Sequence, residues 1–125
     1  MSDLEKLYQE QILAHHRAPR NPGRLDQPSH AAEAHNPLCG DRVRVTLRVG
    51  ALPASAALGV LEARCDAQGC ALCRASGSML TELVIDQTLA QVDAWLARFL
   101  ELAATPAAPR ETDASIWRRA SPPSA

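Results

Sequence analysis

Aromatic residues are scarce in this chain of 125 residues, where phenylalanine, tyrosine and tryptophan together account for only 3%. A core with so few rings must be built mainly from alanine, leucine and valine, which favours helices packed closely on a small sheet. The chain also lacks aromatic platforms on which bases could stack, and any lysine- or arginine-rich block that could follow a phosphate backbone. We therefore expect no nucleic-acid partner.

Long apolar runs are missing too. No window approaches the roughly 18 apolar residues of a membrane-spanning helix. The first seven residues, Met-Ser-Asp-Leu-Glu-Lys-Leu, carry charges where a secretion signal has an apolar segment. We therefore expect no membrane partner and a cytoplasmic location, in which the four cysteines are metal ligands or reactive thiols and do not form disulfides.

The rest of the composition is that of a globular protein. Hydrophobic residues make up 46% of the chain and charged residues 22%, and the net charge is −1. A chain of this length is large enough to form a single core without disulfides or structural metals. We expect one domain over residues 1–120, followed by a disordered tail at residues 121–125.

A helix is predicted over residues 4–16, because apolar side chains recur there at helical spacing. Asp3 is the expected N-cap, and Pro19 and Pro22 prevent the helix from continuing. The polar stretch that follows, up to Asn36, shows no clear period.

Two strands are predicted in the middle of the chain. Residues 36–41, Asn-Pro-Leu-Cys-Gly-Asp, form a turn, since proline fixes one backbone dihedral and Gly40 permits a positive one. Apolar and polar residues then alternate over residues 43–49, as in a strand with one apolar and one basic face. A second strand over residues 58–65 completes an antiparallel hairpin. Its expected inner face consists of Leu61, Ala63 and Cys65.

Helices are predicted for the remainder of the chain. One begins at Cys70 and continues to Val84, another spans residues 87–103, and Asp113 can cap a short last helix. The order of helix, antiparallel sheet and further helices indicates an α+β domain of two layers. The expected buried stripe of the 87–103 helix is Leu89, Val92, Leu96, Phe99 and Leu100.

Cys39 and Cys70 have the most informative surroundings of the cysteines. Cys39 lies in the predicted turn before Gly40, and Cys70 follows Gly69 at the predicted start of a helix. The unpaired amide groups of a first helical turn favour a thiolate, which is the form of cysteine that binds zinc and iron. Asp41 is two residues from Cys39, so its carboxylate can join the same ion. A lone cysteine is more often a small buried apolar residue, and this is the alternative for each thiol.

Three motifs occur in order around these residues. Residues 14–23 read Ala-His-His-Arg-Ala-Pro-Arg-Asn-Pro-Gly, and residues 36–41 precede the alternating strand. Gly-Cys-Ala-Leu at residues 69–72 precedes Ala-Ser-Gly-Ser-Met-Leu-Thr-Glu at residues 75–82. In this combination the chain resembles the IscU/SufU (NifU N-terminal) scaffold family over residues 4 to about 85.

This resemblance implies an α+β fold in which a small antiparallel sheet of about three strands packs against helices. It also implies a carrier, not an enzyme, that assembles iron–sulfur clusters, or binds zinc, and accepts sulfur from a cysteine desulfurase. Cys39, Asp41 and Cys70 match the first cysteine, the aspartate and the second cysteine of the family's metal site. The expected cofactors are therefore zinc or iron and a transient iron–sulfur cluster, with Cys39 as the first candidate to receive sulfur.

The chain departs from the family at the third cysteine, because Asp113 stands in that place. Asp113 either completes a site of two thiolates and two carboxylates, which suits zinc or ferrous iron better than a stable cluster, or is only a helix cap. Cys73, where the family usually has serine, lies one helical turn after Cys70. It either replaces the missing ligand or belongs to the core. Cys65, on the inner face of a strand, is interpreted as a packing residue.

Two other functions stay open on the sequence alone. The missing third cysteine fits a zinc-binding sulfur acceptor or regulator that no longer assembles clusters. Residues 70–73, Cys-Ala-Leu-Cys, also have the form of a thiol-redox motif, although such a switch has no use for Cys39 and Asp41. Residues 105–110 retain only the proline and basic character of the family's chaperone-recognition segment, so we do not expect chaperone binding.

Overall fold

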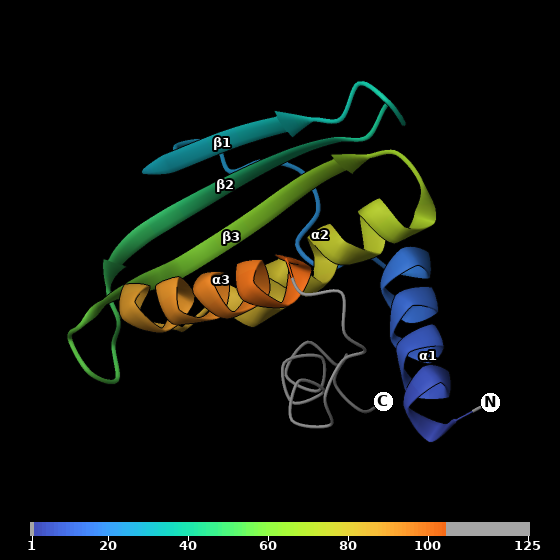
Figure 1. Cartoon of the computed structure of the whole chain (residues 1–125). Helices are drawn as coiled ribbons and strands as arrows, with labels where there is room; N and C mark the ends of the chain where they lie inside the picture. The colour runs from blue at the N-terminus through green and yellow to red at the C-terminus, as the bar shows by residue number, and fades with distance from the viewer. Residues whose placement is uncertain (1, 105–125) are drawn as a thin grey trace.

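The computed structural model describes residues 2–104, which form a three-stranded sheet with helices on one side of it (Figure 1). No helix in this range is both long and apolar enough to cross a membrane. The short helix predicted from Asp113 and the tail predicted at residues 121–125 lie outside the described residues. In chain order the elements are α1 (Asp3–Arg17), β1 (His30–His35), β2 (Arg42–Ala51), β3 (Leu58–Gln68), α2 (Ala71–Val84) and α3 (Leu89–Ala104).

The sheet has the strand order β1–β2–β3, and both neighbouring pairs are antiparallel. His35 of β1 pairs with Arg42 of β2, which also pairs with Gln68 of β3. The end of β1, the start of β2 and the end of β3 therefore meet at one end of the sheet. This arrangement confirms the α+β class, the predicted antiparallel hairpin and the three-stranded sheet that the family resemblance implied.

The strand β1 is the one element that no sequence period indicated. Its residues, His-Ala-Ala-Glu-Ala-His, lack both an apolar alternation and β-branched side chains, and all six are exposed. Its backbone pairs with β2 along its whole length, and Glu33 and Arg44 form a salt bridge across the pair at 3.3 Å. Backbone pairing at a sheet edge leaves little trace in the side chains, which explains why this strand was not predicted.

The inner face of β3 differs from the prediction at one position. The pairing register between β2 and β3 shifts at Arg48/Val49, so one extra residue is accommodated in β3. As a result Val60, only 1% exposed, occupies the core beside Ala63, whereas Leu61 is only partly buried. The strict alternation that predicted Leu61 for the core is wrong there, because a bulge changes which side chains face inward.

The first helix is capped one residue earlier than predicted. The hydroxyl of Ser2 accepts a hydrogen bond from the backbone N–H of Glu5 at 3.2 Å, and Ser2 has the extended backbone of an N-cap. The predicted Asp3 cap is therefore wrong, and Asp3 is a first-turn residue whose charge interacts favourably with the helix dipole. The helix ends at Arg17, before Pro19, as expected.

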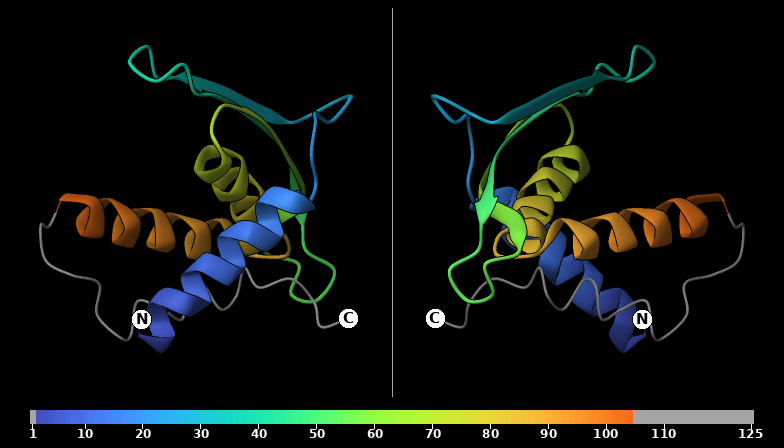
Figure 2. Two further views of the ribbon diagram at one scale, coloured as in Figure 1. Left: turned by 90° about the vertical axis from the view of Figure 1, so that its right-hand side faces the viewer. Right: turned by 90° about the vertical axis from the view of Figure 1, so that its left-hand side faces the viewer.

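Fewer apolar side chains of helix α3 are buried than its helical spacing predicted. Its first half packs against the hydrophobic core through Leu89 and Val92. Its second half extends beyond α2 (Figure 2), and there Leu96 is 54%, Phe99 61% and Leu100 58% exposed. Their predicted burial is wrong for the part of the chain that the structure describes, because helical spacing places residues on one face without showing what covers that face.

A buried network of hydrogen bonds holds the segment after α1 against α2. The Nδ1 atom of His15 lies 2.6 Å from the hydroxyl oxygen of Ser78. The same oxygen accepts a hydrogen bond from the backbone N–H of Arg20 at 2.7 Å. One turn further along α2, the hydroxyl of Thr81 accepts a hydrogen bond from the side-chain amide of Asn21 at 3.2 Å. Two hydroxyls of one helix therefore fix the course of the chain between α1 and the sheet.

We expect Ser78→Ala to lower the free energy of unfolding by about 1–3 kcal/mol, because the Arg20 N–H loses its acceptor inside the protein. Urea unfolding followed by circular dichroism measures this loss. Ser76→Ala is the matched control, since Ser76 lies on an exposed face of the same helix and its loss should change stability by less than about 0.5 kcal/mol. Equal effects of the two substitutions would contradict the role assigned to the network.

Candidate functional site

The candidate site lies at the end of the sheet where the three strand ends meet. Asp41 directly precedes β2, and Gly69 and Cys70 directly follow β3. The Oδ1 atom of Asp41 accepts a hydrogen bond from the backbone N–H of Cys70 at 3.3 Å. A Cβ atom at position 69 would overlap this carboxylate, so glycine is required for the approach. The β2–β3 register thus places a carboxylate at the start of α2.

Cys39 lies in the turn between β1 and β2. The Asn36 N–H donates to the Asp41 carbonyl and the Gly40 N–H to the Asn36 carbonyl, each at 2.8 Å. The Asn36 side chain accepts from the Leu38 N–H at 3.0 Å, and Gly40 has a φ of 75°. The predicted turn and the predicted role of Gly40 are confirmed. The thiol of Cys39 is exposed at this turn, close in sequence to the carboxylate of Asp41.

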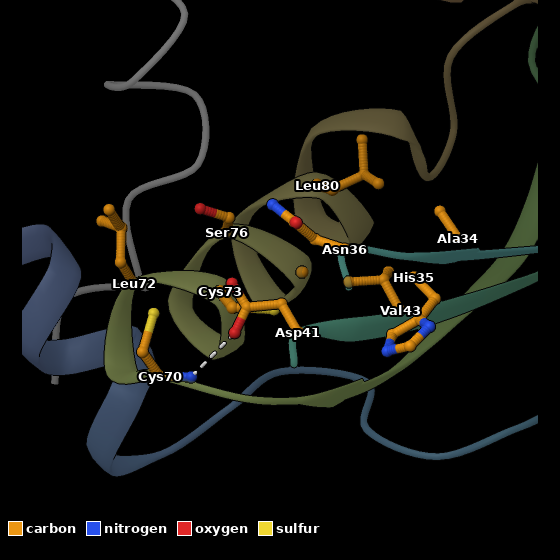
Figure 3. A pocket seen from close by; sticks show the side chains of 11 residues that line it. Ala34, His35, Asn36, Asp41, Val43, Cys70, Leu72, Cys73, Ser76 and Leu80 are labelled. Carbon is orange, nitrogen blue, oxygen red and sulfur yellow. Dashed lines mark hydrogen bonds between the residues drawn. The ribbon is translucent and has the colours of Figure 1, made fainter. Parts of the chain in front are cut away.

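A hollow of about 500 Å³ opens between this end of the sheet and α2. Asp41, Cys70 and Cys73 line one part of it, and Figure 3 shows these three side chains close together, with the Asp41 carboxylate directed toward the start of α2. Cys39 is not among the residues that line the hollow. The structure therefore groups two thiols and a carboxylate directly, with a third thiol on the adjacent turn.

Electrostatic interactions link Cys73 to the other three groups. Partial burial raises the pKa of the Cys73 thiol above its ordinary value, and the negative charges of Asp41, Cys70 and Cys39 raise it further. Cys39 is therefore near enough to the hollow for its charge to act on Cys73. Several acidic groups gathered in this way repel one another when ionised, and a divalent cation among them would relieve that repulsion.

Cys65 is placed differently from the other three cysteines. It is buried on the inner face of β3, and its Sγ atom lies where a Cβ atom at Gly77 of α2 would come within 2.6 Å. Burial, together with the negative charges of Cys73 and Asp66, raises the pKa of this thiol to about 11. Its interpretation as a packing residue agrees with this position, since the missing side chain of Gly77 leaves the space for its sulfur.

We expect the Cys65 thiol to make the protein less stable at high pH. Its pKa of about 11 in the folded protein exceeds the ordinary value of 9.0, so the unfolded chain releases this proton first as the pH rises. The stabilising contribution is complete below pH 9 and is lost as the pH approaches 11, by at most about 3 kcal/mol. Urea unfolding of the wild type and Cys65→Ala at about pH 8 and about pH 10.5 measures it. Equal losses of stability in both proteins would refute the assignment.

The predicted ligands are therefore brought together only in part. Asp41 and Cys70 are in contact, Cys39 is nearby on the turn, and Asp113 lies outside the described residues. Within residues 2–104, no three histidine, cysteine, aspartate or glutamate side chains already stand in an arrangement that could hold a metal ion. An ion at this site would require the donors to draw closer together than they are here.

The apolar walls of the hollow were not predicted from the sequence. They consist of Ala34 and Val43 on the sheet and Leu72 and Leu80 on α2. Leu80 shares a helical face with Cys73, because it lies seven residues, about two turns, further along α2. This spacing could have indicated Leu80, whereas Leu72 is adjacent to Cys73 and Ala34 belongs to the strand that had no sequence signal. In Figure 3, Ala34 and Leu80 lie away from the thiols, whereas Leu72 lies beside Cys70.

Comparison with known proteins gives matches of one kind. A model of the NifU-like N-terminal domain matches residues 7–113. The bifunctional protein NifU/MnmA of Rubrobacter xylanophilus is 46% identical to the chain over 80 residues, and the zinc-dependent sulfurtransferase SufU of Bacillus subtilis is 34% identical over 84 residues. These matches cover 64% and 66% of this chain, but only 15% and 52% of the two relatives. The chain thus spans about half or less of the length of the curated relatives it matches.

Solved structures resemble the chain over nearly its full length. A NifU-like N-terminal protein from Brucella abortus superposes with a TM-score of 0.64 at 25% identity, covering 94% of this chain and 80% of that one. An iron–sulfur cluster assembly scaffold protein for the SUF system from Fervidobacterium islandicum superposes with a TM-score of 0.70 at 16% identity, covering 93% and 81%. The second likeness concerns the fold alone, and it agrees with the α+β arrangement of sheet and helices.

Proposed function

Because this chain belongs to the NifU-like N-terminal domain family, we propose that it is an iron–sulfur cluster assembly scaffold that carries metal and sulfur. In this proposal it is a carrier and not an enzyme, and it receives sulfur from a cysteine desulfurase. The observation that carries the proposal is the hydrogen bond from the Cys70 amide to the Asp41 carboxylate, which joins two donor segments distant in sequence. All four cysteines are free thiols, which suits the reducing cytoplasm that we propose as its location.

The donor set of this site suits iron or zinc. Cys39 and Cys70 would supply thiolates and Asp41 a carboxylate oxygen, a combination that both ions accept. These acidic groups lie near one another and repel when ionised, so a divalent cation among them is favoured. A bound ion would hold the thiols in their ionised form. Because Cys39 lies on an exposed turn outside the hollow, we expect this turn to move toward Cys70 when an ion is bound.

Sulfur transfer to Cys39 requires no outside oxidant or reductant. The Cys39 thiolate attacks the outer sulfur of the persulfide on the desulfurase, and a new sulfur–sulfur bond forms. The sulfur–sulfur bond within the donor breaks, the donor cysteine leaves as a thiolate, and Cys39 carries the persulfide. The exposure of Cys39 supports this role, because the attacking thiolate must reach a sulfur atom held by another protein.

Incubation with a cysteine desulfurase and free cysteine tests the sulfur step. We expect mass spectrometry to find one additional sulfur atom on the peptide that contains Cys39. Cys39→Ser should abolish this addition, whereas Cys65→Ala should leave it unchanged, because Cys65 is buried away from the surface. Sulfur found equally on every thiol, or no sulfur on the folded wild type, would contradict the proposal.

Metal content of protein purified without oxygen tests the ligands separately. We expect Cys39→Ser, Cys70→Ser and Asp41→Ala each to reduce the iron or zinc that copurifies, and Cys65→Ala to leave it unchanged. Asp113→Ala extends the test to the predicted ligand outside the described residues. Unchanged metal content in both cysteine-to-serine variants would remove Cys39 and Cys70 from the site.

A second candidate function is a zinc-binding sulfur acceptor that does not assemble clusters. The 34% identity to a zinc-dependent sulfurtransferase favours it, as does a donor set that combines thiolates with a carboxylate. Anaerobic reconstitution with iron and sulfide separates the two functions. A scaffold develops the visible charge-transfer absorption of a cluster, whereas a zinc-bound sulfur acceptor shows no such absorption and retains its zinc.

A further inference from the structure

Cys73 is a thiol at the candidate site to which the family resemblance assigns no role. It lies three residues after Cys70, at the spacing Cys-x-x-Cys, and both line the same hollow together with Asp41 (Figure 3). Cysteines at this spacing are among the commonest pairs of zinc ligands, because two thiolates around one tight turn reach a single ion. The shared hollow adds Asp41 to the two thiols, which the spacing alone does not predict.

The local structure at the start of α2 leaves both thiols available to an ion. Cys70 is the N-cap residue, with an extended backbone at φ −71° and ψ 169°, but its side chain makes no capping hydrogen bond. Its backbone N–H is taken by Asp41, and its carbonyl accepts from the Arg74 N–H at 3.1 Å. Cys73 lies in the first turn, partly exposed, and is not part of the hydrophobic core. Neither thiol is therefore needed to cap the helix or to fill the interior.

The surroundings of Cys73 differ from those of the packing cysteine. Cys73 is partly exposed and lines the hollow together with Asp41 and Cys70. Cys65, which does pack, is buried against Gly77 and does not line this hollow. The donors within residues 2–104 must draw closer together to hold an ion, and Cys73 would then supply a third thiolate.

We propose that Cys73 supplies the third thiolate of the metal site and makes a ligand at position 113 unnecessary. The inference rests on the proposed function, because it completes the donor set of the same site. The site of this chain is then thiolate-rich, with three sulfur ligands and one carboxylate, and two of its sulfurs come from a single helix start. The complete set is Cys39, Asp41, Cys70 and Cys73.

Cobalt(II) bound to the full chain under anaerobic conditions counts the thiolates. Each cobalt–thiolate bond adds to the charge-transfer absorption in the near ultraviolet, so the wild type should show the intensity of three thiolates. Cys73→Ser should lower the intensity by about one third and weaken binding by at least about tenfold. Asp113→Ala and Cys65→Ala, the two controls, should change neither quantity. Circular dichroism confirms that each variant is folded.

X-ray absorption spectroscopy of the zinc-bound wild type gives a second count that needs no substitution. Three sulfur ligands and one oxygen support the inference. Two sulfur ligands, with weaker binding in Asp113→Ala and unchanged binding in Cys73→Ser, overturn it while leaving the carrier function intact. A Cys70–Cys73 disulfide that forms reversibly in place of metal binding also overturns it, in favour of a thiol-redox role. No binding of either ion by the folded wild type overturns both this inference and the metal-carrier function, whereas sulfur loading of Cys39 tests that function separately.

Discussion

Gly59→Ala is expected to lower the free energy of unfolding by about 3 kcal/mol. A Cβ atom at this position would come within 2.5 Å of both the Gln87 carbonyl oxygen and the Cδ1 atom of Leu52. The carbonyl cannot withdraw easily, because it accepts a hydrogen bond from the Val60 N–H at 3.0 Å. Since small domains are stable by only about 5–15 kcal/mol, the loss is a large fraction of the total. Urea unfolding of metal-free protein measures it.

Gly50→Ala is the matched control for this substitution. Gly50 pairs with Gly59 across the two strands, so both variants add one methyl group to a strand at the same level of the sheet. At Gly50 the added carbon would meet only the end of the Leu61 side chain, 2.8 Å away, which can turn aside. We expect a change of less than about 1 kcal/mol. Equal losses at the two positions would show that the clash with the Gln87 carbonyl is not the cause.

Gly69→Ala is expected to weaken zinc binding by about 10- to 100-fold. The added Cβ atom would overlap the Asp41 carboxylate and force it away from the Cys70 amide, to which it is now hydrogen-bonded. A proposed ligand is thereby displaced although no donor has been removed. Competition with a chromophoric chelator measures the zinc affinity, and thermal unfolding of the metal-free variant shows whether the fold is retained.

The double variant Gly69→Ala/Asp41→Ala tests whether this effect passes through Asp41. If the alanine acts by displacing the carboxylate, the double variant should bind zinc no more weakly than Asp41→Ala alone, because the two changes remove the same interaction. Independent, additive losses would mean that position 69 affects zinc through the backbone of Cys70 and not through Asp41.

Much of the fold follows from local sequence patterns. The alternation over residues 43–49 predicted β2, and apolar residues at helical spacing predicted α1 and α2 close to their observed ends. Apart from the N-cap of α1, which is Ser2 and not Asp3, the failures share one physical cause. The edge strand β1, the bulge that exchanges Leu61 for Val60, and the exposed second half of α3 all depend on which elements are neighbours in space. Periodicity within one segment carries no information about its neighbours.

In the candidate site, too, local features were predictable from the sequence and contacts between elements were not. The flanking glycines marked Cys39 and Cys70, and Gly40 has the positive φ that the turn required. The contact between Asp41 and Cys70 depends on strand register. So does the need for glycine at position 69, where a Cβ atom would overlap the Asp41 carboxylate, and no local motif reveals either feature. Cys73 was one of two alternatives for the missing ligand, and its partial exposure and its place in the hollow distinguish it from a core residue.

The hydrogen bond between Asp41 and Cys70 closes the end of the β2–β3 ladder, where Arg42 pairs with Gln68. Sliding one strand by a single residue would turn its inward side chains outward and separate this carboxylate from the helix start. An ion bound by Asp41 before β2 and by Cys70 after β3 would therefore hold the two strands in this register. Release of the ion would then weaken the strand pairing at this end of the sheet. Hydrogen exchange at the Arg42 and Gln68 amides would measure that change.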